Sequence, residues 1–156
     1  MGRKILKIGV PTLILIMVVV ALLAPIGPLP GFIIGGTATD TPADWGDTST
    51  TDEIVLEVQG GIPRVVTIWV VQVDGELHVV GSKESGWVKK LANGGAVRMR
   101  MGANTYALNA SLLANDWEPI LMAYVSKYQP NYPDIVGSFP PLEEAAATTA
   151  VFRLSR

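Results

Sequence analysis

The chain has 156 residues, a formal net charge of −2 and no cysteine. This length allows one compact domain and a short appended segment. The slightly acidic balance argues against a general nucleic-acid-binding protein, because neutralising phosphates requires clustered Lys and Arg. The lack of Cys excludes disulfides, thiolate metal sites and thiol nucleophiles. Hydrophobic residues make up 49% of the sequence, and the excess lies in one N-terminal run.

That run contains no charged residue from Ile8 to Ile34 and follows a basic tail, residues 1–7. About twenty apolar residues, at roughly 1.5 Å each, cross a hydrocarbon core of roughly 30 Å. We therefore predict an uncleaved membrane anchor, a transmembrane helix within residues 8–34. A cleaved signal peptide is the alternative, but this run is longer than the usual apolar core of a signal peptide. In addition, Pro25 follows the small residue Ala24 and should hinder cleavage there.

The distribution of basic residues predicts the orientation of the anchor. Arg3, Lys4 and Lys7 precede the run, and the next basic residue is Arg64. By the positive-inside rule the N-terminus is cytoplasmic and the domain extracytoplasmic, which means periplasmic in a Gram-negative cell. A re-entrant turn at Pro25–Pro30 is the alternative; it ranks lower because the second apolar arm is too short to span.

Residues 35–52 are rich in Gly, Thr, Asp and Pro and contain no basic residue. We predict a flexible acidic linker that holds the domain off the bilayer. A calcium-binding loop would need regularly spaced oxygen ligands, a Gly at the turn and a closing Glu. The four Asp residues of the segment match that pattern poorly.

Residues 53–156 form the predicted domain. Alternating or β-branched runs predict six strands, namely Ile54–Val58, Arg64–Val73, Leu77–Gly81, Ala96–Met101, Tyr106–Leu112 and Ala150–Leu154. A helix is predicted after an N-cap at Ser85, and a second one, with a core face that includes Trp117, after Asp116. A Pro-rich loop, Gln129–Pro141, precedes the last strand. This order predicts an α+β, mainly β fold: a closed or partly closed barrel of about six strands with two helices.

Several segments of the domain resemble one known superfamily. They are Gly61–Trp69, the hairpin Val73–Leu77, Val80–Lys83, Trp87–Asn93, Val97–Gly102, Tyr128–Pro133 and Val151–Leu154. Together they resemble the flavin-binding split β-barrel superfamily, which includes pyridoxamine 5′-phosphate oxidase. The branch with the greatest resemblance is the deazaflavin-dependent nitroreductase family.

The resemblance implies a cofactor, FMN or a deazaflavin of the F-420 type, whose phosphate lies near the third strand and the helix that follows it. A helix N-terminus with neighbouring Lys residues suits an anion. The residues implied for the phosphate are Ser82, Lys83, Ser85, Lys89 and Lys90. Those implied for the ring system are Arg64 and Thr67, with Trp69 or Trp87 stacking on it or lining its pocket. Split barrels of this kind usually form homodimers with the cofactor between protomers.

Two departures from the family pattern bear on function. Nitroreductase relatives carry a basic turn where this chain has Glu57–Gly61, and an Arg-Lys pair of the oxidases is replaced by Gly86 and Trp87. One hypothesis is a membrane-anchored flavin- or deazaflavin-dependent oxidoreductase that reduces a hydrophobic acceptor, a quinone or a nitro compound. Because the cofactor carries the hydride, no catalytic residue is identified. The other hypothesis is a non-catalytic module that binds a small ligand or a partner and has lost the flavin phosphate site.

The remaining polar and aromatic residues receive simpler interpretations. His78, the only histidine, is predicted at a solvated strand position, and one His without Cys makes no metal site. Arg98 and Arg100 share one face of a strand and are predicted to be exposed on the sheet. Tyr128 and Tyr132 fit either a lipid interface or the barrel core.

Overall fold

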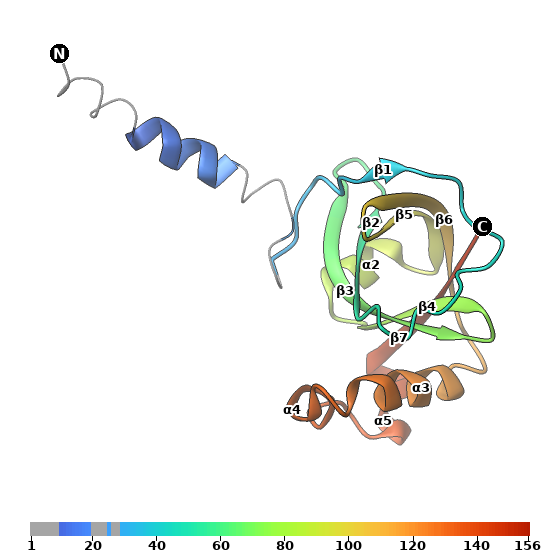
Figure 1. The fold of residues 1–156 in the computed structure, drawn as a ribbon. Coiled ribbons are helices and arrows are strands. Elements are labelled where there is room, and N and C mark those ends of the chain that lie inside the picture. Colours follow the sequence, from blue (N-terminus) through green and yellow to red (C-terminus); the bar gives the residue numbers. More distant parts are fainter. Residues whose placement is uncertain (1–9, 20–24, 26–28) are drawn as a thin grey trace, which may run out of the picture.

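The computed structural model describes residues 10–19, 25 and 29–156 (Figure 1). Residues 10–19 are helical. The strands are β1 (Thr37–Ala38), β2 (Glu53–Val58), β3 (Arg64–Val73), β4 (Glu76–Ser82), β5 (Gly94–Met101), β6 (Asn104–Leu112) and β7 (Thr149–Ser155). The helices of the domain are α2 (Gly86–Leu91), α3 (Glu118–Tyr128), α4 (Pro133–Val136) and α5 (Leu142–Thr148).

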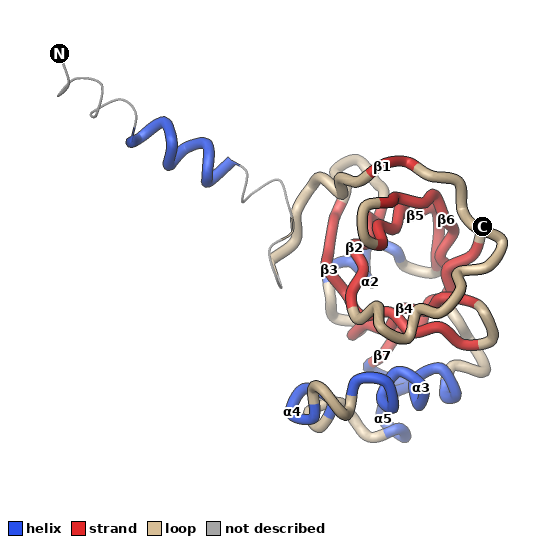
Figure 2. The backbone as a smooth tube through the Cα atoms, in the orientation of Figure 1, coloured by secondary structure: helices blue, strands red, loops and turns tan. Residues whose placement is uncertain are grey.

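Strands β2 to β7 close into one antiparallel barrel. The strand order is β6-β5-β2-β3-β4-β7, and an additional β6–β7 pairing closes the ring that Figure 2 shows end-on. The short strand β1 lies outside this ring and pairs with β6 in parallel. The predicted mainly β barrel of about six strands is therefore confirmed.

The predicted elements match the structure most closely where the sequence pattern is strongest. β3 spans Arg64–Val73 as predicted, and the other barrel strands differ from the prediction by one or two residues at their ends. α4 and α5 were not predicted. α4 begins at Pro133 within the predicted Pro-rich loop, because proline is compatible with the first turn of a helix.

The inside of the barrel is filled by alternate residues of the strands and closed by α2. Trp87, Val88 and Leu91 of this helix are buried in the same cluster as the inward-facing strand residues. The Trp87 ring lies 5.7 Å from the ring of Phe152. It also lies against Gly81, where an added Cβ would come within 2.3 Å of the indole. Gly81 is thus required so that the tryptophan can enter the barrel.

β3 changes its neighbour at Val70. Residues 64–69 of β3 pair with β2, whereas the pairing with β4 runs from Val73 back to Val70 and stops there. The edge that β2 leaves uncovered is covered by α3. The Tyr128 hydroxyl accepts a hydrogen bond from Val70 N at 3.0 Å and lies 2.6 Å from Val70 O, to which it can donate. Lys127 Nζ donates to the same carbonyl at 2.9 Å and to Thr51 O at 2.7 Å.

Aromatic stacking strengthens this attachment of α3. The Trp69 ring stacks on Tyr128 at 4.1 Å, with an interplanar angle of 11°. Tyr124 and Tyr132 surround the same indole at 5.9 and 4.8 Å. Tyr128 is completely buried, so of the two sequence-based alternatives, lipid interface or core, the structure assigns this tyrosine to the core.

The segment before β2 lies against the barrel. Gly31 forms two backbone hydrogen bonds with Val65 of β3, at 2.8 and 2.9 Å. Ile34 is buried against Val55 and Val65. Further on, Thr48 is buried and its hydroxyl donates to Gln72 at 2.9 Å. Residues 35–52, predicted as a flexible linker, thus share hydrogen bonds and packing with the barrel.

No helix among residues 10–19, 25 and 29–156 is both long and apolar enough to cross a membrane. Within the predicted anchor, residues 8–9, 20–24 and 26–28 lie outside the described part of the chain. The anchor, its orientation and the localisation therefore stay predictions.

The prediction for one titratable strand residue was wrong. His78 is 4% exposed rather than solvated, and its Nδ1 donates to Glu76 O at 3.2 Å. Arg98 is exposed as predicted, with 46% of its side chain accessible, and it also pairs with a carboxylate. Its Nε and Nη2 donate to the two carboxylate oxygens of Glu57 at 2.7 and 2.5 Å. Because Glu57 lies directly opposite on β2 and is 4% exposed, the pair neutralises a buried charge.

We expect Tyr128→Phe to lower the free energy of unfolding by about 1–3 kcal/mol, because the backbone groups of Val70 lose a buried partner. Urea unfolding followed by tryptophan fluorescence measures the change. Tyr106→Phe is the matched control, since the Tyr106 hydroxyl forms no hydrogen bond with the described residues, and we expect it to cost less than about 0.5 kcal/mol. Equal costs for the two variants would contradict this role of Tyr128.

His78 predicts a pH dependence of stability. Burial lowers the pKa of His78 below its ordinary value of 6.5, so the unfolded chain binds a proton at a higher pH than the folded one. The contribution of His78 to the free energy of unfolding is therefore fully present above pH 6.5. It is lost as the pH falls towards the lowered pKa of the folded state.

The measurement is the free energy of unfolding between about pH 7.5 and pH 5.5 for the wild type and for His78→Gln. The wild type should lose more stability on acidification than the variant, which lacks the titrating ring. A difference between the two proteins that does not change over this range would show that His78 does not cause the dependence.

Candidate functional site

The residues implied by the family resemblance lie where β3 and β4 diverge. β3 and β4 pair only from Val73↔Glu76 to Val70↔Val79. Beyond that point the rest of β4, Val80–Ser82, pairs with β7. The nine residues lie on these two diverging strand ends, in the loop after β4 and on α2: Arg64, Thr67, Trp69, Ser82, Lys83, Ser85, Trp87, Lys89 and Lys90.

The structure does not bring the two tryptophans to one pocket. Trp87 belongs to the cluster inside the barrel, whereas Trp69 packs into the cluster under α3 outside it. Thr67 alternates with Trp69 on β3 and so shares its outward side. Both indoles are already in contact with aromatic rings of the chain. Neither presents a free face for stacking on a cofactor.

Two of the three implied lysines bind groups of this chain. Lys83 Nζ donates to Ala146 O of α5 at 2.5 Å. Lys89 forms an ion pair with Glu84 at 2.5 Å, in which both side chains are largely exposed. The hydrogen bond from Lys89 lowers the pKa of the Glu84 carboxyl. An exposed ion pair of this kind contributes little to folding stability. These two lysines are not poised for a phosphate in this arrangement.

The two implied serines form hydrogen bonds with backbone groups of the loop between β4 and α2. The Ser85 hydroxyl donates to Ser82 O at 2.8 Å, and Ser82 Oγ accepts from Glu84 N at 3.2 Å. Ser85 is the N-cap residue of α2, as predicted, but its side chain makes no capping hydrogen bond. The two hydroxyls thus hold the turn at the end of β4.

Arg64 and Lys90 are the implied cations that bind nothing in the described part of the chain. The Arg64 guanidinium lies against Gly86 at the start of α2, where an added Cβ would be 2.9 Å from Cζ. Its Nε is buried and has no hydrogen-bond partner. Lys90 Nζ lies over Gly60 in the β2–β3 turn, 2.6 Å from the corresponding Cβ position. Close approach of both cations depends on glycine at these two positions.

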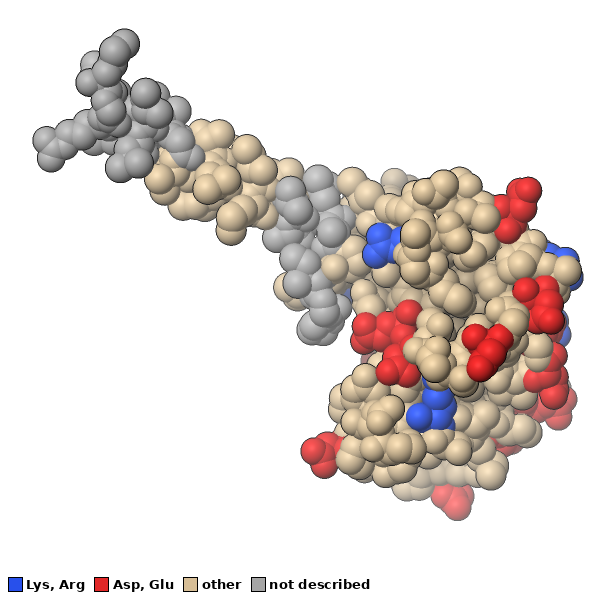
Figure 3. Space-filling model, viewed as in Figure 1, with Lys and Arg blue, Asp and Glu red and all other residues tan. Residues whose placement is uncertain are grey.

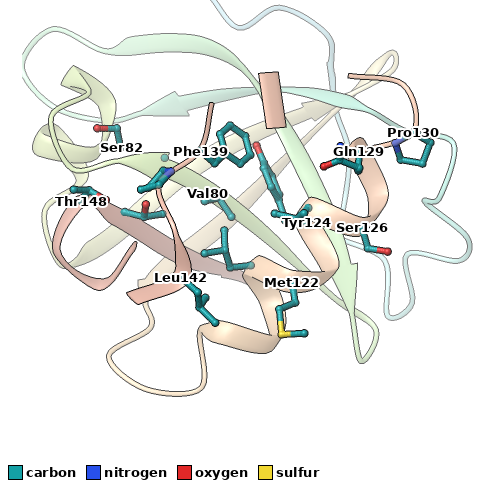
Figure 4. A pocket seen from close by; sticks show the side chains of 15 residues that line it. Val80, Ser82, Met122, Tyr124, Ser126, Gln129, Pro130, Phe139, Leu142 and Thr148 are labelled. Carbon is teal, nitrogen blue, oxygen red and sulfur yellow. The ribbon is translucent and has the colours of Figure 1, made fainter. Parts of the chain in front are cut away.

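A cavity of about 830 Å³ lies outside the barrel wall, between α3, the end of β4 and the chain around α5 (Figure 4). We call it the α3–β4 pocket. Its volume falls within the range of roughly 300–1,000 Å³ that is common for small-molecule sites. The residues that line it are Val80, Gly81, Ser82, Leu121, Met122, Tyr124, Val125, Ser126, Gln129, Pro130, Phe139, Pro140, Leu142, Thr148 and Thr149.

The lining of the α3–β4 pocket is uncharged throughout. Figure 4 shows Ser82 and Thr148 at one end and Gln129 and Pro130 at the other, with apolar side chains between them. Burial raises the pKa of Tyr124 far above its ordinary value, so this phenol stays neutral as well. The arrangement can hold an apolar body and offer hydroxyl and amide groups to polar ends.

Only Ser82 of the nine implied residues lines the α3–β4 pocket. The other lining residues come mainly from α3 and from the segment between α3 and β7. The sequence analysis treated the apolar residues of α3 as a core face, and Tyr124 belongs both to that core and to the pocket wall. The Pro-rich composition around Phe139 was the one signal that a non-core surface lay here.

The described residues contain no group of three or more His, Cys, Asp or Glu side chains that could hold a metal ion. His78 does not line the α3–β4 pocket. Within the described part of the chain, the chemistry available to a ligand is therefore apolar contact, neutral hydrogen bonding, and the two cations Arg64 and Lys90.

No protein-family model matches this sequence, and no curated protein matches it at the significance required. Among solved structures, the haem storage protein HutZ from Vibrio cholerae aligns with a TM-score of 0.50 and 16% identity. The alignment covers 69% of this chain and 83% of HutZ. At this identity the likeness concerns the fold alone. The chain has the split β-barrel fold, and this part of the sequence-based prediction is confirmed.

Two further structures align with lower scores. The FAD and haem binding protein from Mycobacterium smegmatis has a TM-score of 0.49 and 19% identity, over 69% of this chain and 62% of that protein. A candidate pyridoxamine 5′-phosphate oxidase from Listeria innocua has a TM-score of 0.45 and 17% identity, over 67% of this chain and 83% of that protein. Assignment to the deazaflavin-dependent nitroreductase branch stays a prediction.

Proposed function

We propose that this split barrel is a binding module for one small, largely apolar molecule, which it holds in the α3–β4 pocket. The observation that carries the proposal is the uncharged lining of a cavity of about 830 Å³. Such a lining gains free energy from the burial of apolar ligand surface. The polar side chains at its two ends would fix the orientation of the molecule.

A planar ring system is the ligand class that fits this pocket best. Val80, Phe139 and Leu142 form extended apolar walls, while Ser82 and Thr148 mark one end. A flavin ring, a porphyrin and a quinone all combine an apolar face with polar edges. HutZ is described as a haem storage protein, and the sequence resemblance implies a flavin, so these two ligands are the first to test.

The α3–β4 pocket offers groups for binding and contains no group suited to proton transfer. No carboxylate, imidazole or amine lines it, and the pKa of Tyr124 is raised by burial. A general acid or base needs a pKa near the working pH and a place within hydrogen-bond reach of the substrate. The lining therefore suits a binding module, whereas an enzyme built here would take its reactive group from a cofactor.

Arg64 supports a second candidate function, a flavin- or deazaflavin-dependent oxidoreductase. Its buried Nε lacks a partner, and its guanidinium lies beside the start of α2. A phosphate there would satisfy a donor that is otherwise costly to bury. In this hypothesis the cofactor supplies the hydride, and a membrane-anchored homodimer reduces a quinone or a nitro compound.

The first experiment titrates the purified full chain, held in lipid nanodiscs, with FMN, an F-420 type deazaflavin and haemin. Val80→Trp should weaken the ligand that binds by at least about tenfold, or ~1.4 kcal/mol, because the indole fills part of the pocket. Ile135→Trp is the matched control, since Ile135 is exposed on α4 and does not line the pocket. Binding that Val80→Trp leaves unchanged would contradict the assignment to the α3–β4 pocket.

The second experiment separates the two candidate functions by comparing FMN with riboflavin, which lacks the phosphate. If Arg64 holds the phosphate, Arg64→Met should weaken FMN binding by about 1.5–3 kcal/mol and leave riboflavin binding unchanged. A fully apolar site predicts equal affinity for both ligands in both proteins. Failure of FMN, deazaflavin and haemin all to bind would rule out the flavin enzyme and the flavin or haem form of the binding module.

A further inference from the structure

We propose that one end of the barrel, at the β2–β3 turn, lies on the surface of a lipid bilayer. This turn face consists of Leu29, Phe32, Ile33, Ile62 and Lys90. The proposal goes beyond ligand binding in the α3–β4 pocket. It depends on the predicted association of the N-terminal apolar run with a membrane, although docking of the face itself requires no spanning helix.

The turn face exposes four large apolar side chains. Leu29 is 66% exposed, Phe32 46%, Ile33 54% and Ile62 68%. They come from two segments that the fold brings side by side. Gly31 pairs antiparallel with Val65, so Ile33 lies towards Ile62 and Leu29 lies further along β3. Grouped exposed apolar side chains on a small domain mark a surface that contacts another phase or molecule.

A cation lies beside the backbone of the β2–β3 turn, close to Ile62. A Cβ added to Gly60 would lie 2.6 Å from Lys90 Nζ and 3.9 Å from Ile62 O, so the ammonium group and the Ile62 backbone flank the same glycine. Lys90 forms no ion pair with the described residues. Neither the turn, residues 59–63, nor α2 contains an acidic residue. A basic group at the edge of an apolar patch is typical of surfaces that dock on anionic lipid.

Continuity with the N-terminal run argues for lipid rather than a protein partner. Leu29, Phe32 and Ile33 belong to the charge-free stretch from Ile8 to Ile34, and the bond between Gly31 and Val65 holds them on the barrel. Figure 1 shows this part of the chain reaching the barrel on the β3 side. Figure 3 shows acidic side chains spread over the barrel and the helices on the visible face, which an anionic surface would repel.

The absence of cysteine allows a direct test with single-cysteine variants. An environment-sensitive nitrobenzoxadiazole dye is attached to Ile62→Cys, Phe32→Cys or Ile135→Cys in the full chain. The labelled proteins are reconstituted in vesicles of phosphatidylcholine and phosphatidylglycerol. Ile135 is the control because it is 50% exposed on α4, away from the turn face in sequence and in packing.

Nitroxides on the lipid acyl chains should quench the dye at positions 62 and 32 at least about twofold more than at 135, because only the turn face enters the interface. Aqueous iodide should give the opposite order. Position 62 decides the test, since it lies outside the N-terminal run. Adding Lys90→Glu should lower lipid quenching at position 62 in vesicles with phosphatidylglycerol and leave it unchanged in phosphatidylcholine alone.

Three outcomes would overturn the proposal. Equal lipid quenching at positions 62 and 135 would show that the turn face stays in water. Protection of position 62 from both quenchers would indicate a protein partner or a second copy of the chain. Failure of the full chain to float with the vesicles would show that the protein does not bind the membrane.

Discussion

The change of neighbour at Val70 of β3 is the constraint on which the rest of the domain depends. A strand that leaves one neighbour for another exposes backbone groups that must find new partners, because buried unpaired groups are costly. Here the partners are the Tyr128 hydroxyl and the Lys127 ammonium, both from the last turn of α3. Burial lowers the pKa of Lys127, whereas the nearby charges of Asp52 and Asp47 oppose this shift and favour its charged form. α3 is therefore part of the barrel closure rather than a helix packed on a finished barrel.

The same constraint creates the candidate site. The C-terminal turn of α3 is held at Val70, where the pairing of β3 with β4 ends, while β4 continues to Ser82 paired with β7 alone. The outer face of this end of β4 lies open next to the helix. Phe139 and Leu142 complete the walls from the chain after α4. The α3–β4 pocket thus follows from how two strands separate, and its lining is uncharged because the residues that face it also stabilise the fold by apolar packing. The cations implied by family resemblance lie elsewhere, in the turn and helix that close the barrel.

The sequence predicted those features that depend on local pattern. The β-branched run of β3 and the hairpin Val73–Leu77 were correctly placed, because strand alternation and turn residues are local features of the sequence. The burial of His78 was not predicted, because the residues that cover a strand face come from distant segments. The pairing of Gly31 with Val65 was not predicted for the same reason, since the two residues are far apart in the sequence. Among the candidate site residues, the resemblance could not show that Trp69 and Lys83 already bind parts of this chain.

The two hydrogen bonds between Gly31 and Val65 also determine how the domain responds to force. They attach the chain that precedes the barrel to the start of β3, next to Ile34, which is buried against Val55 and Val65. A pull applied at residue 29 therefore loads the backbone hydrogen bonds to β3 before it reaches residues 35–52. The attachment at Gly31 therefore leaves the barrel little freedom to rotate relative to residue 29.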